Sequence, residues 1–301
     1  MQAPILLSGT SNEPLALAVG KTLNISLGKI EIGRFTDTEC RVRVMEEVSG
    51  RNVFVLQSLS MIADQNLVEL CLIGQALRQL KAEKITAIIP WMGYSKQDKE
   101  FRPGEAVSAQ LIATFLEAAG FNSVITVELH SEMITPYFHI PIKELSTHSL
   151  FAKELKKRNK TNIVVVSPDM GGKSRSEKFA HEVNLPIVYL EKKRDRTTGE
   201  VVVTSVSQDV SGKNIVIFDD IINTGATVIK TSEFLKAHGA GNIYFMATHA
   251  VLAGDAAKKL ADSTIDEIVV TDSIHLPKEK MFSKLSVISV AQTIADDIIT
   301  P

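Results

Sequence analysis

The chain has 301 residues, 45% of them hydrophobic, which is sufficient for two globular domains of ordinary size. A formal net charge of −2 gives no general attraction to nucleic acid or to an anionic membrane. Two cysteines are too few for a disulfide framework, no apolar stretch approaches the ~18–20 residues of a membrane span, and the N-terminus lacks the basic segment of a secretion signal. The sequence therefore predicts a cytoplasmic globular protein with no nucleic-acid or membrane partner.

Short apolar runs alternate with amphipathic helical patterns along the chain. Glycines at 120 and 239 each follow a helical pattern, where a C-terminal cap is expected. The alternation predicts an α/β fold with mostly parallel sheets. Strands are predicted at 5–8, 52–56, 84–89, 123–127, 162–166, 186–190, 214–218, 242–247 and 267–270, and helices at 65–80, 105–119, 172–183 and 226–238.

The two halves of the chain resemble each other. Residues 49–55 (SGRNVFV) match 211–217 (SGKNIVI) at an offset of 211 − 49 = 162. Any two α/β halves share some such patterns, but an ordered series of matches indicates a duplication. We therefore predict two domains, 1–145 and 146–301, with the last helix free to pack on the first. Only the second half carries a pair of adjacent aspartates after its matching strand, so only that half is expected to bind a sugar phosphate.

Residues 216–227 (VIFDDIINTGAT) join an apolar strand to the start of a helix. Asp219 and Asp220 end the apolar run, and alternation along a strand predicts that their side chains point to opposite sides, one toward a ligand and one bracing the loop. Thr224 and Gly225 follow at the helix start, where backbone N–H groups bind anions. Carboxylates can bind the hydroxyl groups of a sugar and backbone amides can bind its phosphate, so this segment predicts a site for a phosphorylated sugar. The alternative is that the two aspartates only solvate a turn.

A second strand leads into residues 167–175 (SPDMGGKSR). A serine stands where a P-loop needs its first glycine, and a proline follows it, which argues against a Walker A motif. What remains is Asp169 beside Gly171 and Gly172 and two cations. This set suits a metal-bound diphosphate, and a glycine turn with solvated charges is the alternative.

His130 lies at the carboxyl end of a third predicted strand. A lone histidine is more often structural than a ligand. Parallel strands, however, are expected to bring His130 to the same sheet edge as Asp169 and Asp219. We therefore include it as a candidate ligand.

Two further segments are rich in cations. Residues 191–196 (EKKRDR) are either a solvated face or a mobile loop whose charges stabilise the transition state of phosphoryl transfer. Residues 91–105 (WMGYSKQDKEFRPGE) combine cations with aromatic rings, which can stack on a base, but the pattern by itself favours an ordinary surface loop.

Together these segments resemble those of the ribose-phosphate diphosphokinases, also called phosphoribosyl pyrophosphate synthetases, from Ile5 to the last helix. Residues 216–227 resemble the phosphoribosyl-binding loop of the type I phosphoribosyltransferase fold, and 34–39 (RFTDTE) resemble a family loop that binds adenine, commonly from a neighbouring subunit. Residues 93–105 are similar to the family's ATP-binding loop, closest to archaeal-type members. The resemblance implies an α/β fold with two tandem type I phosphoribosyltransferase-like domains, each a mostly parallel sheet flanked by helices. It also implies a homo-oligomer, at least a dimer, with a hexamer as one option.

The resemblance also implies a reaction and a set of site residues. The family transfers the diphosphoryl group of ATP to the C1 hydroxyl of ribose 5-phosphate with Mg²⁺. Ribose 5-phosphate would be bound by Asp219, Asp220, Asn223, Thr224, Gly225, Ala226 and Thr227. ATP would be bound by Phe35, Asp37, Glu39, Lys96 and Gln97, and the diphosphate by Asp169, Gly171 and Gly172. Magnesium would be associated with His130 and Asp169, and Lys192 and Arg194 would be the catalytic cations of a flexible loop.

Two alternatives stay open. Asn223 stands where many relatives carry aspartate, which leaves a non-catalytic regulatory homologue as one alternative. A phosphoribosyltransferase that consumes the activated sugar is the other. The duplicated first half and residues 91–105 count against it, because such an enzyme needs one domain of this kind and a hood for the nucleobase.

Overall fold

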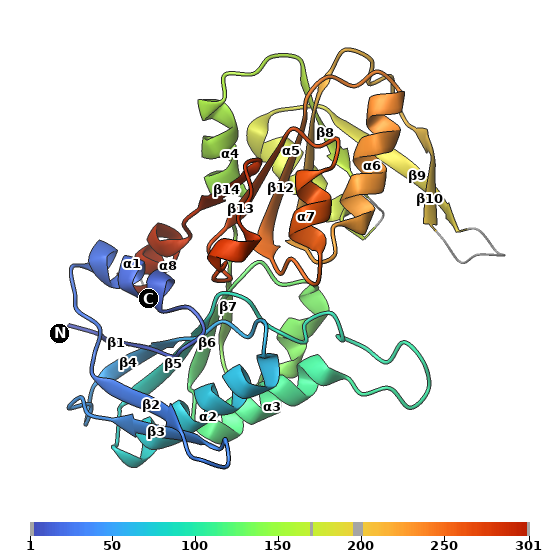
Figure 1. Cartoon of the computed structure of the whole chain (residues 1–301). Helices are drawn as coiled ribbons and strands as arrows, with labels where there is room; N and C mark the ends of the chain where they lie inside the picture. The colour runs from blue at the N-terminus through green and yellow to red at the C-terminus, as the bar shows by residue number, and fades with distance from the viewer. Residues whose placement is uncertain (1–2, 169–170, 195–200, 300–301) are drawn as a thin grey trace. The chain divides into compact units, whose positions relative to one another are not determined.

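The computed structural model describes residues 3–168, 171–194 and 201–299, excepting the side chains of 192–194 and 201–203. The chain forms two compact units (Figure 1). Unit 1 comprises Met1–Ser146, Ser273–His275 and Ser289–Pro301, and unit 2 comprises Thr147–Asp272 and Leu276–Ile288. The last helix therefore belongs to the N-terminal unit.

Unit 1 is built on a parallel sheet of five strands in the order β1-β4-β5-β6-β7, with a separate two-stranded hairpin. Its strands are β1 (Ile5–Ser8), β2 (Ile30–Arg34), β3 (Cys40–Val44), β4 (Asn52–Leu56), β5 (Lys84–Ile89), β6 (Ser123–Val127) and β7 (Ile142–Leu145). Its helices are α1 (Glu13–Leu23), α2 (Ala63–Gln79), α3 (Ser108–Ala119), the 3-10 helix η1 (Glu132–Tyr137) and α8 (Ala291–Ile299).

Helices cover both faces of this sheet (Figure 1). The α2 and α3 helices bury one apolar face against the strands, and alternate strand residues such as Val53 and Val55 point into that core. On the other face α1 and α8 pack against each other and bury Leu15 and Ile294. Because both faces are buried, the strands read as continuous apolar runs, which made them visible in the sequence.

Unit 2 is built on a sheet of seven strands in the order β10-β9-β8-β11-β12-β13-β14. All neighbouring strands are parallel except β9 and β10. The strands are β8 (Ile163–Ser167), β9 (Ile187–Arg194), β10 (Val201–Val206), β11 (Asn214–Ile222), β12 (Ile243–Ala250), β13 (Glu267–Thr271) and β14 (Leu285–Ile288). The helices are α4 (His148–Lys157), α5 (Lys173–Val183), α6 (Ala226–Ala237), α7 (Ala256–Ala261) and the 3-10 helix η2 (Lys278–Lys280).

The sheet of unit 2 also has a core on each face. One core joins α4 and α5 to the strands through aromatic residues, with the rings of Phe179 and Phe218 stacked at a centroid distance of 4.2 Å. The other core joins α6 and α7 to alternate strand residues such as Ile215 and Ile217. The predicted α/β fold with mostly parallel sheets flanked by helices is therefore confirmed.

The strand orders of the two units match. In unit 1, β1 lies beside β4, followed by β5, β6 and β7, and in unit 2, β8 lies beside β11, followed by β12, β13 and β14. Ile5 pairs with Val53, and Val164 pairs with Ile215, so the repeated sequences occupy the same register. This is the arrangement that a duplication predicts.

Two predicted strand boundaries were wrong. The strand that carries the adjacent aspartates does not end with them, because Ile221 and Ile222 still pair with His249 and Ala250 of the long β12. The strand predicted at 186–190 also continues further, as β9, to Arg194, because it pairs with β10, a strand that the sequence analysis missed.

Both cysteines are free thiols in unit 1. Burial raises the pKa of Cys71 to about 11, and the pKa of Cys40 is raised by burial and by the charge of Glu69. Raised values keep the thiols protonated, so less than about 1% of Cys71 is thiolate at pH 8.

We therefore expect slow alkylation of the native protein by iodoacetamide at pH 8, measured by mass spectrometry. The same protein in denaturant is the control and should react completely. Rapid labelling of Cys71 in the native protein at pH 7 would contradict this burial.

Candidate active site

The loop 223–227, called the sugar loop below, joins β11 to the start of α6. Gly225 precedes the first helical residue with a φ of 75°, and its carbonyl accepts a hydrogen bond from the Ile229 N–H at 3.0 Å. The loop residues other than this buried glycine are exposed, namely Asn223, Thr224, Ala226 and Thr227. The N-terminus of a 12-residue helix thus lies beside exposed hydroxyl groups, an arrangement suited to a phosphate.

The adjacent aspartates on β11 differ in accessibility. The Asp219 side chain is 21% exposed and the Asp220 side chain is 3% exposed. Oδ1 of Asp219 accepts a hydrogen bond from the Asp220 backbone N–H at 2.9 Å. Both carboxylates also contact one guanidinium nitrogen, Nη1 of Arg175. This shared contact was not expected, because alternation along a strand predicts that the two side chains point to opposite sides. One acid is therefore accessible and the other buried, although both have a cationic partner in common.

Gly225 should be intolerant of a side chain. Its backbone is left-handed, and an added Cβ would lie 3.0 Å from Cδ2 of Leu260 and 3.1 Å from its Cγ. We expect Gly225→Ala to lower the free energy of unfolding by about 1–2 kcal/mol, measured in urea.

Gly212→Ala is the matched control, because Gly212 has a φ of 66° with nothing within 4 Å of an added Cβ. The control keeps the backbone strain without the crowding. Equal destabilisation by the two substitutions would contradict a role for the Leu260 contact.

The diphosphate loop is described in part. Asp169 lies outside the described residues, whereas Gly171 is exposed and Gly172 is the buried residue that precedes α5. The Gly172 carbonyl accepts a hydrogen bond from the Ser176 N–H at 2.9 Å. The glycine pair therefore lies at the start of an 11-residue helix, α5, just as the sugar loop lies at the start of α6.

The predicted catalytic cations lie on β9, which forms a long antiparallel hairpin with β10 (Figure 1). Lys192 is paired with Val203 and Arg194 with Val201. The side chains of Lys192 and Arg194 and the residues 195–200 lie outside the description, so only the backbone of these two positions is located.

The predicted adenine-binding residues lie at the tip of the β2–β3 hairpin of unit 1. Phe35 is 51% exposed, and its N–H donates to the carbonyl of Glu39 at 2.9 Å. Asp37 Oδ1 accepts a hydrogen bond from the Glu39 N–H at 3.2 Å, and the Arg41 guanidinium lies 5.9 Å from the Phe35 ring centroid. The ring is thus presented by a short, internally bonded turn.

Lys96 and Gln97 lie in the loop between β5 and α3. The Gln97 carbonyl accepts a hydrogen bond from the Ala109 N–H at 3.2 Å, and its side-chain oxygen accepts one from the Ser108 hydroxyl. Gln97 is exposed and Lys96 is partly buried. The start of α3 therefore anchors this end of the predicted ATP loop.

Ser95, beside these residues, is buried, and its hydroxyl has no hydrogen-bond partner among the described groups. An unpaired buried hydroxyl destabilises a protein, so Ser95→Ala should raise the free energy of unfolding by about 1 kcal/mol, measured by urea denaturation.

Ser58→Ala is the matched control for Ser95→Ala, because Ser58 is equally buried but donates to the Ser273 carbonyl. The control should lower the free energy of unfolding by about 1 kcal/mol. A Ser95→Ala variant less stable than the wild type would show that the hydroxyl is satisfied in solution.

His130 follows β6 in unit 1, whereas Asp219 lies on β11 in unit 2. The expectation that they share one sheet edge is wrong, because the two halves form separate sheets. Near His130 the backbone is held by the Leu129 N–H, which donates to Glu144 Oε1 at 2.7 Å. Across the described residues, no group of three or more His, Cys, Asp and Glu side chains is arranged to hold a metal ion.

The counterpart of the aspartate pair in unit 1 is filled by polar side chains of the protein itself. Gln57 Nε2 donates to the buried Glu69 carboxylate at 2.7 Å, and Thr10 donates to the same carboxylate through its N–H at 2.7 Å. An added Cβ on Gly9 would lie 2.4 Å from Gln57 Oε1. The first half therefore offers no equivalent of the sugar loop at this place.

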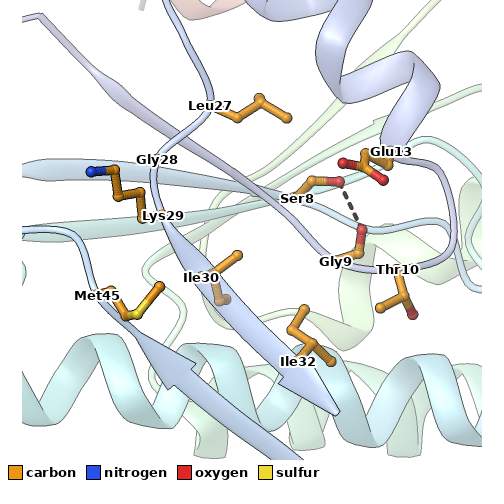
Figure 2. Close-up of a pocket in the computed structure, with 10 residues that line it drawn as sticks. All are labelled: Ser8, Gly9, Thr10, Glu13, Leu27, Gly28, Lys29, Ile30, Ile32 and Met45. Atoms are coloured by element: carbon orange, nitrogen blue, oxygen red, sulfur yellow. Dashed lines mark hydrogen bonds between the residues drawn. The ribbon is translucent and has the colours of Figure 1, made fainter.

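A pocket of about 390 Å³ lies beside this network in unit 1 (Figure 2). Its wall combines Glu13 and Lys29 with apolar side chains, including Ile30, Ile32 and Met45. None of the predicted site residues lines it. This pocket is therefore distinct from the candidate active site.

Comparisons with known proteins identify family matches in both units of the chain. Residues 4–120 match the model of the N-terminal domain of ribose phosphate pyrophosphokinase, and residues 198–300 match that of the phosphoribosyl synthetase-associated domain. Neither match depends on the other, and together they include most of both units.

Curated relatives and a solved structure agree with these matches. The "Ribose-phosphate pyrophosphokinase" of Ralstonia nicotianae is 39% identical over 97% of this chain and 93% of its own, and that of Caldanaerobacter subterraneus is 38% identical over 98% and 93%. The crystal structure of phosphoribosylpyrophosphate synthetase from Mycobacterium smegmatis is similar with a TM-score of 0.93 and 32% identity, over 99% of this chain and 98% of that one.

Two α/β units that match the ribose phosphate pyrophosphokinase N-terminal domain and the phosphoribosyl synthetase-associated domain define the class of protein as a two-domain α/β transferase. Within it, the chain belongs to the ribose-phosphate pyrophosphokinase family. None of the helices in the described ranges is long and apolar enough to cross a membrane.

Sequence reasoning missed one feature of this site. Arg175 was counted only as one of two cations near the glycine pair, with no specific role. The contact with Asp219 and Asp220 joins residues 44 and 45 positions apart, which no local pattern reports. The signal available was the arginine's place in the first turn of a helix that follows a strand.

Proposed function

We propose that this protein transfers the diphosphoryl group of ATP to the C1 hydroxyl of ribose 5-phosphate, giving 5-phosphoribosyl 1-diphosphate and AMP. The observation that carries the proposal is the sugar loop of unit 2, in a chain of the ribose-phosphate pyrophosphokinase family. Aspartates on β11 suit sugar hydroxyls, and the first turn of α6 suits the 5-phosphate.

In this reaction the C1 hydroxyl oxygen attacks the β-phosphorus of ATP, the bond from that phosphorus to the α,β-bridging oxygen breaks, AMP leaves with that oxygen, and the hydroxyl proton is released to solvent. Such a step depends on positioning and charge neutralisation more than on a strong base. We assign Asp219 and Asp220 to the sugar and the sugar loop, Asn223 to Thr227, to its phosphate. The hydroxyl is thereby held for in-line attack.

The remaining roles follow from the family. We assign Lys192 and Arg194 to the phosphate oxygens that gain charge in the transition state, and Asp169, Gly171 and Gly172 to the diphosphate. A further group is assigned to ATP, with the Phe35 ring on adenine: Phe35, Asp37, Glu39, Lys96 and Gln97.

We propose Mg²⁺ as the cofactor, with His130 and Asp169 as its associated residues. Mg²⁺ usually keeps several waters and is held by one or two protein groups together with substrate phosphates. A carboxylate beside a glycine pair suits that mode of binding. When bound, the ion neutralises phosphate oxygens.

A homo-oligomer in the cytoplasm fits these assignments. Phe35 is half exposed at a hairpin tip, where it can reach the ATP of a neighbouring copy, so we propose at least a dimer. Two free thiols suit a reducing compartment.

A non-catalytic regulatory homologue is the second candidate, and Asn223 favours it because it removes a carboxylate from the sugar loop. An assay of AMP release separates the two. The enzyme should form AMP only when ATP, Mg²⁺ and ribose 5-phosphate are all present. Ribose 5-phosphate binding without AMP release would favour the regulatory homologue.

A further inference from the structure

Arg175 lies in the first turn of α5, the helix that follows the glycine pair of the diphosphate loop. Its Nη1 is 3.3 Å from Oδ1 of Asp219 and 3.1 Å from Oδ1 of Asp220. The arginine side chain is only 16% exposed. One guanidinium thus contacts both aspartates of the candidate sugar site from a different element.

We propose that Arg175 is a positioning residue for the sugar site, which holds the Asp219 carboxylate in place for the hydroxyls of a sugar phosphate. This inference rests on the proposed function and extends it to a residue outside the sugar and diphosphate loops. Arg175 acts through the aspartates and does not itself contact the reacting atoms.

Electrostatics supports this role. Two adjacent carboxylates repel each other, and the nearly buried Asp220 would be costly as an unpaired charge. A cation within 3.3 Å of both offsets that repulsion, and carboxylates are strong acceptors for sugar hydroxyls. Without Arg175, the Asp219 carboxylate would lose a contact that orients its Oδ1.

The backbone supports it as well. Ser176, the next residue, is fully buried and its hydroxyl donates to the Phe218 carbonyl at 3.2 Å. Two consecutive residues of α5 are therefore fixed to consecutive residues of β11. Because the glycine pair precedes α5 and the aspartates lie on β11, Arg175 and Ser176 hold the start of the diphosphate loop's helix in register with the sugar site.

A purely structural ion pair is the alternative explanation, and the chain contains a matched example. Arg158 in unit 2 is 12% exposed and also contacts two carboxylates, Glu154 at 2.9 Å and Glu267. It lies at the end of α4, and neither carboxylate belongs to the candidate site. A structural effect of removing a buried arginine should therefore appear equally in Arg158→Met.

The test measures the Kd of ribose 5-phosphate by calorimetry, and KM and kcat by AMP release, for the wild type and for Arg175→Met, Arg175→Lys and Arg158→Met. We expect Arg175→Met to raise the Kd and KM for ribose 5-phosphate by about tenfold or more, with the KM for ATP changed less than about twofold. Arg175→Lys should raise the Kd and KM for ribose 5-phosphate by only about threefold, because an ammonium group supplies the charge but not the planar arrangement of donors of a guanidinium group. Arg158→Met should lower the melting temperature and leave the Kd within about twofold.

A Kd within about twofold of the wild type in Arg175→Met would overturn the proposal. So would an increase in Kd in Arg158→Met as large as the increase in Arg175→Met. If Arg175→Met does not fold, Arg175→Lys decides, and an unchanged Kd in that variant overturns the proposal. Binding without AMP release in the wild type would refute the proposed reaction and leave the Kd comparison decisive for Arg175. A wild type that does not bind ribose 5-phosphate would overturn both.

Discussion

Replacing Lys192 by alanine is expected to lower kcat by about 10³-fold while ribose 5-phosphate still binds. Cations that meet phosphoryl oxygens as charge develops contribute factors of this size in related reactions. Lys192 lies on β9, where it pairs with Val203 of β10, and is separate in sequence from the sugar loop. Single-turnover AMP formation measures the chemical step, and calorimetry with ribose 5-phosphate measures binding.

Lys160→Ala is the control for Lys192→Ala, because Lys160 is an exposed lysine of the same unit that lies in a loop. It should leave kcat within about twofold, since exposed charges contribute little. A wild-type kcat in the Lys192→Ala enzyme would contradict a catalytic role for this position.

Replacing Asp219 by asparagine is expected to lower kcat/KM for ribose 5-phosphate by about 10²-fold. The substitution keeps the shape of the side chain but removes the charge that accepts hydroxyl groups and contacts Arg175. Loss of a charge-assisted hydrogen bond costs about 1.5–3 kcal/mol, which corresponds to a factor between about 10 and about 160. Initial rates at varied ribose 5-phosphate and fixed ATP measure the effect.

Asp262→Asn is the control for this substitution, since Asp262 is exposed and follows α7 outside the candidate site. It should leave kcat/KM unchanged. An Asp219→Asn variant as active as the control would mean that the sugar is held elsewhere.

The buried elements were the predictable part of the fold. Strands such as β4 and β5 are covered on both faces, so their sequences are continuous apolar runs, and the predicted ranges 52–56 and 84–89 match the structure. The C-cap at Gly120 was also predictable, because its φ of 101° favours glycine. Elements with one face toward solvent were missed: β2 and β3 are half exposed, and their short alternating patterns resemble polar loops.

Candidate site residues could be proposed from the sequence where they are contiguous. The two aspartates of β11 and the sugar loop lie within residues 219–227, so these candidate residues could be named without a structure. The contact of Arg175 with the aspartates depends on how α5 packs on β11, which is a tertiary property. The error of placing His130 and Asp219 at one sheet edge arose for the same reason, since alternating elements do not reveal how many sheets they form.

Phosphorus NMR of a reaction mixture tests the central claim most directly. With ATP, Mg²⁺ and ribose 5-phosphate, the proposed function predicts equimolar AMP and a new diphosphate attached to ribose C1, with no ADP and no free diphosphate at early times. Both products should disappear when ribose 5-phosphate is omitted. Formation of ADP, or no reaction by a protein that binds both substrates, would contradict the assignment of this chain as a diphosphoryl transferase.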